Sequence, residues 1–189
     1  MILYDIYLKY FVYNKSILKI LNYLNIIRWR DVDQLIILWP PAFKLINKIL
    51  YEIKLHDFNI LSMHKFKIDI QNFEVFLKEL YEIDFADPKK IAFKLERLKK
   101  DTLIMYTIKI NIKNPKIISQ DYRNHVKCET IGDFKDHVRK KYKKNIQNYV
   151  YDIILHSTEI DYQIPLVESV IKKYTLCYEE IEINKNNSY

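Results

Sequence analysis

A single histidine closes a strongly apolar run in the sequence Ile153-Ile154-Leu155-His156-Ser157-Thr158-Glu159. A neutral imidazole is a good nucleophile near neutral pH, and its phosphorylation divides one phosphoryl transfer into two in-line steps. His156 is therefore our candidate nucleophile. The alternative is a hydrogen-bonded core histidine at a strand end, and the sequence leaves both interpretations open.

Phosphoryl transfer also needs fixed cationic or hydroxyl donors, because the transition state spreads negative charge over three oxygens. The chain offers Arg123, Thr130 and Arg139 before the histidine and Thr158 after it. Mg²⁺ would bridge the phosphates of a nucleotide donor. Arg139 belongs to a basic cluster that is equally typical of a solvated helix face, namely Lys135, Arg139, Lys140, Lys141, Lys143 and Lys144.

The string around His156 resembles the active-site strand of nucleoside diphosphate kinases, where the pattern is Asn-Ile-Ile-His-Gly-Ser-Asp and the histidine accepts phosphate. Further features follow the order of that family across residues 34–174. Where the family ends its first strand in Lys-Pro-Asp, this chain has Trp39-Pro40-Pro41. The family has a tyrosine seven residues before a proline, and here these are Tyr81 and Pro88. It also has an arginine, a Glu-Thr pair and a second arginine in this order, and here these are Arg123, Glu129-Thr130 and Arg139.

This resemblance implies a distant, divergent nucleoside diphosphate kinase-like protein that binds nucleoside triphosphates and diphosphates and forms oligomers. In that comparison Tyr81 helps to fix the imidazole. Glu168 is the candidate carboxylate for the other ring nitrogen, although it lies one position beyond the family's glutamate. The phosphate-contacting lysine of the family is Trp39 here, and its asparagine is Ile153. Either other basic residues replace these donors, the acceptor is unusual, or the site only binds.

Two other classes of function stay open. A binding module of the same fold could hold nucleotide or single-stranded RNA, since bases stack on aromatic rings and phosphates follow basic grooves. Against RNA recognition, the glycine-containing RNP1-type string is absent. The third class is a structural subunit that docks through its N-terminal residues.

Apolar spacing and turn residues predict strands and helices in alternation. We expect an α/β (α+β) sandwich of the ferredoxin-like kind, with a four-stranded antiparallel sheet and helices on one face. A helix at 88–99 should begin at Pro88 with Asp87 as its N-cap. The expected strands are 34–39, 58–68, 102–110 and 149–155, the other helices are 41–55, 72–81, 134–148 and one near 166–171, and residues 111–133 are expected to form a long loop.

We divide the 189 residues into a helical extension (1–32), a core domain (33–178) and a flexible tail (179–189). The single glycine, Gly132, excludes a P-loop, a dinucleotide fingerprint and a nucleophile elbow, which all need several glycines. Two cysteines fit a reducing, cytoplasmic location. The net charge of +7 favours phosphate-bearing partners. We expect no structural metal site and no membrane partner, because neither paired histidine spacing nor a long apolar run is present.

Overall fold

The computed structural model describes residues 31–84, 86–120 and 125–182. The predicted N-terminal extension therefore lies outside the described residues up to position 30, and so does the tail from 183 onward. None of the described helices is both long and apolar enough to cross a membrane.

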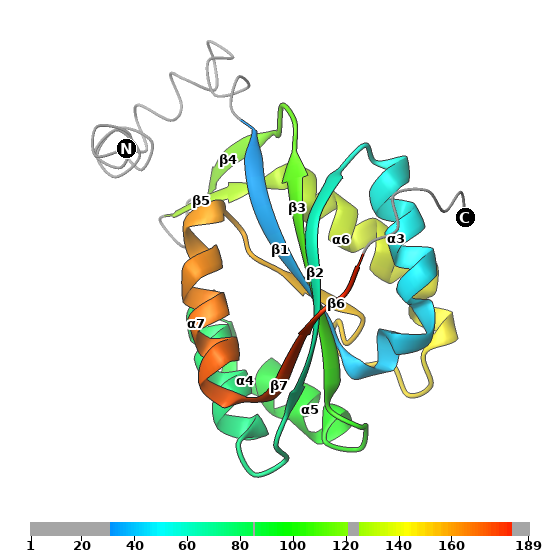
Figure 1. Cartoon of the computed structure of the whole chain (residues 1–189), viewed down its shortest axis with the longest axis vertical. Coiled ribbons are helices and arrows are strands. Elements are labelled where there is room, and N and C mark those ends of the chain that lie inside the picture. The colour runs from blue at the N-terminus through cyan, green and yellow to red at the C-terminus, as the bar shows by residue number, and fades with distance from the viewer. Residues whose placement is uncertain (1–30, 85, 121–124, 183–189) are drawn as a thin grey trace.

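The centre of the fold is one antiparallel sheet (Figure 1). It consists of β1 (Val32–Leu38), β2 (Asn59–Ile68), β3 (Ile104–Ile112), β6 (Leu155–Ser157) and β7 (Thr175–Glu180), in the order β6-β1-β3-β2-β7. Every neighbouring pair in this sheet runs antiparallel. The sheet thus has five strands where four were predicted. The additional strand is β7, which adds to the free edge of β2.

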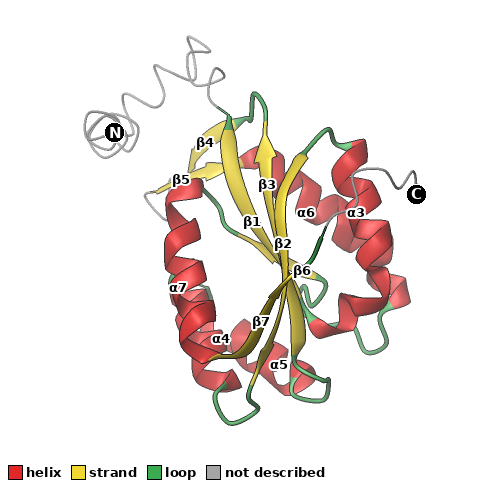
Figure 2. Cartoon of the chain, viewed as in Figure 1, coloured by secondary structure: helices red, strands yellow, loops and turns green. Residues whose placement is uncertain are grey.

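Helices cover both sides of the sheet rather than the single face that we expected. Figure 2 shows α3 (Ile46–Leu55) and α6 (Glu129–Tyr142) on one side, and α4 (Phe73–Glu82) and α7 (Ile164–Tyr174) on the other. Strand β1, which lies between β6 and β3, is buried along almost its whole length. A strand covered on both faces is apolar on both faces, which explains its continuous apolar run.

Two turns with proline position the helices that lead to the candidate site. Pro40 opens the 3₁₀ helix η3 (Pro40–Leu45), which continues into α3. Pro88 opens α5 (Pro88–Leu98), and the carboxylate of Asp87 accepts a hydrogen bond from the Lys89 amide at 2.9 Å. The structure confirms the predicted N-cap, Asp87, and the predicted first helical residue, Pro88.

The segment 111–133 is not one long loop. It contains β4 (Ile117–Gln120) and β5 (His125–Cys128), which pair with each other as a separate two-stranded sheet. Helix α6 then begins at Glu129, five residues earlier than expected, and is followed by the short η4 (Lys143–Asn145). The β4–β5 pairing has little local signal because its strands are only four residues long.

The predicted strand 149–155 is also corrected, because only its last residue belongs to β6. Asn148, Tyr151 and Asp152 adopt positive φ angles of 52°, 30° and 59°, which no strand permits. These residues turn the chain before it enters β6. At the other boundary, β7 runs to Glu180 and so includes the first two residues of the segment predicted as a tail.

Candidate active site

His156 lies in the middle of the edge strand β6, opposite Ile37 of β1. Its ring is buried, with 6% of the residue exposed. The ring atom Nε2 lies 3.1 Å from Oδ2 of Asp84, which follows α4. This carboxylate favours the tautomer with its proton on Nε2, so that the lone pair resides on Nδ1.

The carboxylate beside the imidazole is therefore Asp84 and not Glu168. Gln163, at the end of η5 (Asp161–Gln163), donates from its amide to Oδ1 of Asp84 at 3.3 Å, and its carbonyl oxygen accepts from the Glu159 amide at 2.6 Å. Gln163 thus ties Asp84 to the chain just after the histidine strand. Glu168 lies on α7, where its charge adds to burial in raising the pKa of Tyr178 on β7.

Three aromatic and cationic side chains pack around the ring on this face of the sheet. Tyr81 of α4 meets His156 edge to face, with ring centroids 5.0 Å apart, and stacks on Trp39 at 6.3 Å. Lys94 of α5 donates to the Tyr81 hydroxyl. Its Nζ lies 4.7 Å from the centre of the Tyr81 ring and 5.2 Å from that of Trp39. The Tyr81 ring therefore contacts the histidine and the lysine at once.

The electrostatic environment of His156 is strongly cationic. Burial, followed by the charges of Lys135, Lys94 and Arg139, holds the pKa of His156 well below its usual value. Burial and Arg139 likewise lower the pKa of Lys135. The imidazole is consequently neutral at physiological pH, which is the form that can act as a nucleophile.

Arg139 is held at the outer side of this group. Its Nη2 donates to the Leu155 carbonyl oxygen at 3.0 Å, while Nη1 lies 3.4 Å from Asp152 and 3.5 Å from Asp136. Both carboxylates are exposed, whereas the Arg139 side chain is 17% exposed. Arg139 thus stands between solvent and the buried ring. Its two carboxylate partners are 3.4 and 3.5 Å away, and an anion that binds the guanidinium more tightly could replace them.

Two buried donors near the ring have no acceptor among the described residues: Nε of Arg139 and Nε1 of Trp39. The centroids of the Trp39 and His156 rings are 6.4 Å apart. A buried donor without a partner is uncommon in proteins and costs about 1–3 kcal/mol. Each of the two is a group to which a bound anion could accept a hydrogen bond.

The remaining predicted phosphate ligands are placed differently. The hydroxyl of Thr158 donates to Gln34 at 2.7 Å and accepts from the Leu35 amide at 3.0 Å, so it fastens the end of β6 to β1. The hydroxyl of Thr130 accepts from the Lys116 amide at 2.8 Å. Each hydroxyl therefore accepts a hydrogen bond from a backbone amide, and Arg123 lies outside the described residues.

Sequence reasoning singled out His156, Tyr81 and Arg139, which the structure brings together, but it missed Lys94, Asp84 and Gln163 as members of the site. Lys135 was noted only as part of the basic cluster. The signal available for Lys94 was its position on the inner face of an amphipathic helix, where it is 5% exposed. No local pattern distinguishes such a lysine from one whose chain lies along the surface.

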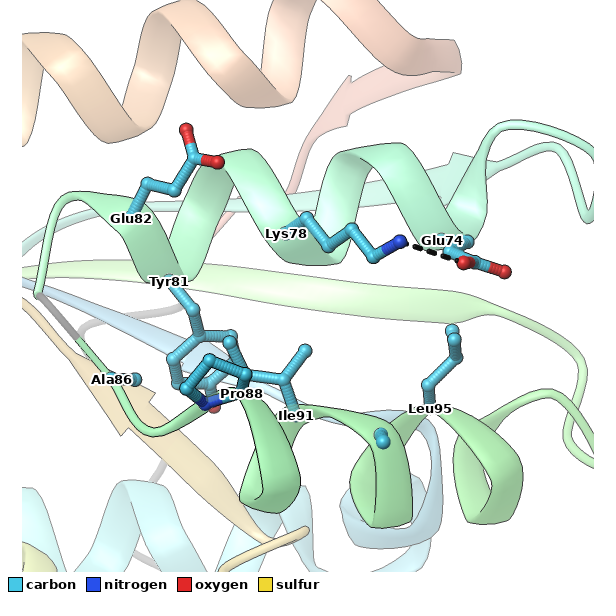
Figure 3. A pocket seen from close by; sticks show the side chains of 9 residues that line it. Glu74, Lys78, Tyr81, Glu82, Ala86, Pro88, Ile91 and Leu95 are labelled. Carbon is cyan, nitrogen blue, oxygen red and sulfur yellow. Dashed lines mark hydrogen bonds and ion pairs between the residues drawn. The ribbon is translucent and has the colours of Figure 1, made fainter.

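A pocket of about 570 Å³ lies between α4 and α5, and Tyr81 is one of the residues that line it (Figure 3). Its wall is mostly apolar and includes Ala86, Pro88, Ile91 and Leu95. The Lys78–Glu74 ion pair of 2.8 Å lies along its edge. His156 is not among its lining residues, but Tyr81 belongs both to this wall and to the candidate site.

An exposed aromatic pair flanks two charged members of the site. Phe93 precedes Lys94 and Tyr151 precedes Asp152; their rings are 5.4 Å apart, and the two residues are 53% and 45% exposed. Tyr151 is carried by the strained turn before β6. Strained backbone and exposed aromatic rings together are typical of ligand-binding positions.

No protein-family model matches the sequence, and a search of the curated proteins finds no match. The chain is similar to solved nucleoside diphosphate kinases. The enzyme of Aquifex aeolicus has 14% identity and a TM-score of 0.47, over 75% of this chain and 95% of that one. The Halobacterium salinarum enzyme in complex with CDP has 10% identity and a TM-score of 0.44, over 83% of this chain and 95% of that one. The Borrelia burgdorferi enzyme with bound vanadate and ADP has 11% identity and a TM-score of 0.45, over 82% of this chain and 94% of that one.

Proposed function

We propose that the protein is a phosphotransferase that moves the terminal phosphoryl group of a nucleoside triphosphate to a nucleoside diphosphate, or to another phosphorylated acceptor, through a phosphohistidine at His156. One observation carries this proposal: a buried, neutral imidazole has a carboxylate 3.1 Å from one ring nitrogen and three basic side chains around it. A purely structural core histidine has no need of three basic neighbours, whose positive charges destabilise its protonated form.

The chemical step uses the lone pair on Nδ1 of His156. This nitrogen attacks the terminal phosphorus, a nitrogen–phosphorus bond forms, and the bond to the bridging oxygen breaks. The electron pair leaves with the nucleoside diphosphate. Positive charge that develops on the ring is stabilised by Asp84, which faces the proton on Nε2. In the second half-reaction a terminal phosphate oxygen of the acceptor attacks the phosphohistidine, and the imidazole returns to its neutral form.

The cations around the ring supply the electrostatic part of the catalysis. Arg139 would exchange its two distant carboxylate partners for phosphoryl oxygens, which are better acceptors. Lys135 lies one helical turn before Arg139 on α6, so both side chains can approach the same ligand. Preorganised charges of this kind cost no reorganisation at the moment of reaction.

Mg²⁺ would enter with the nucleotide, held mainly by the phosphates themselves, as Mg²⁺ usually is in phosphoryl transfer. Among the described residues, no group of three or more His, Cys, Asp or Glu side chains could hold a metal ion. The exposed carboxylate of Asp152 is the side chain in this site that could add one ligand. When bound, the ion would neutralise charge on the donor phosphates.

The Phe93–Tyr151 pair supports a nucleotide rather than a simple phosphate ester. Exposed aromatic rings stack on nucleobases of any identity. Phe93 and Tyr151 are each one residue from a charged group of the cluster, Lys94 and Asp152.

The direct test is incubation of the protein with Mg²⁺ and ATP labelled at the γ-phosphate. We expect a protein-bound label that is labile in acid and stable in base, and that is released by unlabelled nucleoside diphosphate. His156→Ala should abolish the label. The matched control is His64→Ala, which removes a histidine that stacks on Tyr178 at 4.6 Å, away from the cluster. Equal labelling of the His156→Ala protein would overturn the assignment.

A second candidate function is nucleotide binding without transfer, and the 6% exposure of His156 favours it. In that case the cations and the aromatic pair would hold the nucleotide while the ring stays out of reach of the phosphorus. Saturable binding of ATP with no label in the wild-type protein would establish this alternative. Circular dichroism of the His156→Ala protein would show whether a lost signal reflects a lost fold.

A further inference from the structure

We propose that Lys94 is a phosphate-contacting residue and that it takes up a proton when a phosphate-bearing ligand binds beside His156. This inference rests on the proposed function, whose site it deepens. It assigns to α5 a role that the spacing of basic residues in the sequence does not indicate, and it makes ligand binding depend on pH in a defined direction.

The geometry places the amino group of Lys94 inside the site. The residue is 5% exposed, and its Nζ donates to the Tyr81 hydroxyl. The rings of Tyr81 and Trp39 lie within 4.7 and 5.2 Å of this nitrogen. Aromatic faces stabilise a cation at such distances, so the pocket can hold the charged form. The same Tyr81 ring contacts His156, and the charge of Lys94 is one of those that lower the pKa of the imidazole, so the lysine belongs to the group around the histidine.

Charged side chains from α6, from the end of α4 and from the turn before β6 act on Lys94. Burial and the like charge of Arg139 lower its pKa to about 7; Lys135 acts in the same direction, while Asp152 and Asp84 oppose the shift. His156 is neutral and Tyr81 is un-ionised, because burial raises the pKa of its hydroxyl. The free site thus holds Lys94 close to the midpoint of its titration.

An incoming phosphate changes this balance. Two negative charges placed among Lys94, Lys135 and Arg139 outweigh the two opposing carboxylates and favour the protonated amine. A group that gains affinity for a proton on binding must take one up, and by linkage the ligand binds more tightly where the group is already charged. Above pH 7.5, where ADP is fully ionised, the dissociation constant should therefore rise by about tenfold per pH unit.

Titration calorimetry with ADP as the probe tests the inference. Runs at pH 7.5 in two buffers of different ionisation enthalpy give the number of protons taken up per ADP bound. We expect net proton uptake by the wild-type protein, because burial lowers the pKa of Lys94 to about 7 and the amine is therefore partly uncharged at that pH. Lys94→Arg, which keeps a permanent charge, should still bind ADP with near-zero uptake. The surface control Lys78→Arg should behave as wild type.

The outcomes separate the two proposals. Binding of ADP without proton uptake would overturn the inference and leave the proposed function standing. Unchanged uptake in Lys94→Arg would also overturn it, because the proton would then go to another group such as His156. Failure of the wild-type protein to bind ADP would overturn the proposed function together with the inference. A far-ultraviolet spectrum of Lys94→Arg shows that the variant is folded.

Discussion

The amino group of Lys94 lies 5.2 Å from the centre of the Trp39 ring. Trp39 directly follows β1, and it stands where the sequence pattern of nucleoside diphosphate kinases has a lysine. The cation next to this position thus comes from α5, 55 residues further along the chain. The buried amine of Lys94 has consequences for both stability and binding.

Burying Lys94 should reduce the stability of the fold. Its pKa is lowered to about 7 in the folded protein from 10.5, so the unfolded chain binds more protons between these values and stability rises with pH across that window. Because Lys94 is the donor to the Tyr81 hydroxyl, the comparison is made in Tyr81→Phe protein. Adding Lys94→Met should raise the free energy of unfolding at pH 7 by about 1–4 kcal/mol, measured in urea. Adding Lys78→Met instead is the control, and an equal gain there would contradict this reasoning.

Asp84 should act by orienting the imidazole. Asp84→Asn keeps the shape of the side chain but removes the negative charge that faces Nε2 at 3.1 Å. We expect the rate of labelling from ATP to fall by about 10²-fold or more, while ADP affinity changes little. Glu168→Gln, on α7, is the matched control and should label at the wild-type rate. The reverse pattern would restore Glu168 as the orienting carboxylate.

Glu52 should be the most important buried charge outside the site. It is 1% exposed and joins α3 to α6 by accepting hydrogen bonds from Lys141 at 2.7 Å and Tyr142 at 2.8 Å, with His137 at 3.0 Å. Glu52→Gln should cost about 1–3 kcal/mol in free energy of unfolding, because Tyr142 and His137 lose a charged partner while the half-exposed Lys141 becomes solvated. Glu74→Gln, at an exposed ion pair, should change stability little.

The same glutamate should shape stability in acid. Burial acts to raise its pKa, but the hydrogen bonds from Lys141, Tyr142 and His137 prevail and leave it below 4.5. A depressed carboxyl pKa stabilises the fold above the unfolded value and loses this effect as the pH falls through the folded value. Unfolding curves from pH 6 to 3 should therefore fall less steeply for Glu52→Gln than for wild type. Parallel curves for the two proteins would show that Glu52 does not titrate in this range.

The aromatic pair should distinguish nucleotides from other phosphates. Tyr151→Ala removes the ring that lies 5.4 Å from Phe93 and should weaken ADP binding by about 1–3 kcal/mol, the contribution of one stacked base. Pyrophosphate affinity should not change, since that ligand has no base. Tyr51→Ala, an equally exposed tyrosine on α3, is the control. Equal loss for ADP and pyrophosphate would mean that Tyr151 supports the turn rather than the base.

The sequence by itself determined much of the local structure. Asp87 and Pro88 mark the start of α5, and the continuous apolar run marks β1. These signals are reliable because they depend on capping, on the fixed φ of proline and on burial, all of which act between near neighbours in the chain. The shortage of glycine likewise excluded several classes of nucleotide site before any fold was known.

Only the tertiary structure decided which charges meet His156. Asp84 precedes it by 72 residues and Lys94 by 62, and nothing in their local sequence distinguishes them from surface residues. Their roles arise because α4 and α5 bring them close to the imidazole on the edge strand β6. Packing there excludes water, and this strengthens the electrostatic interactions within the group. The addition of β7 to β2 and the β4–β5 pair were equally invisible, since strand pairing is fixed by partners far away in the chain.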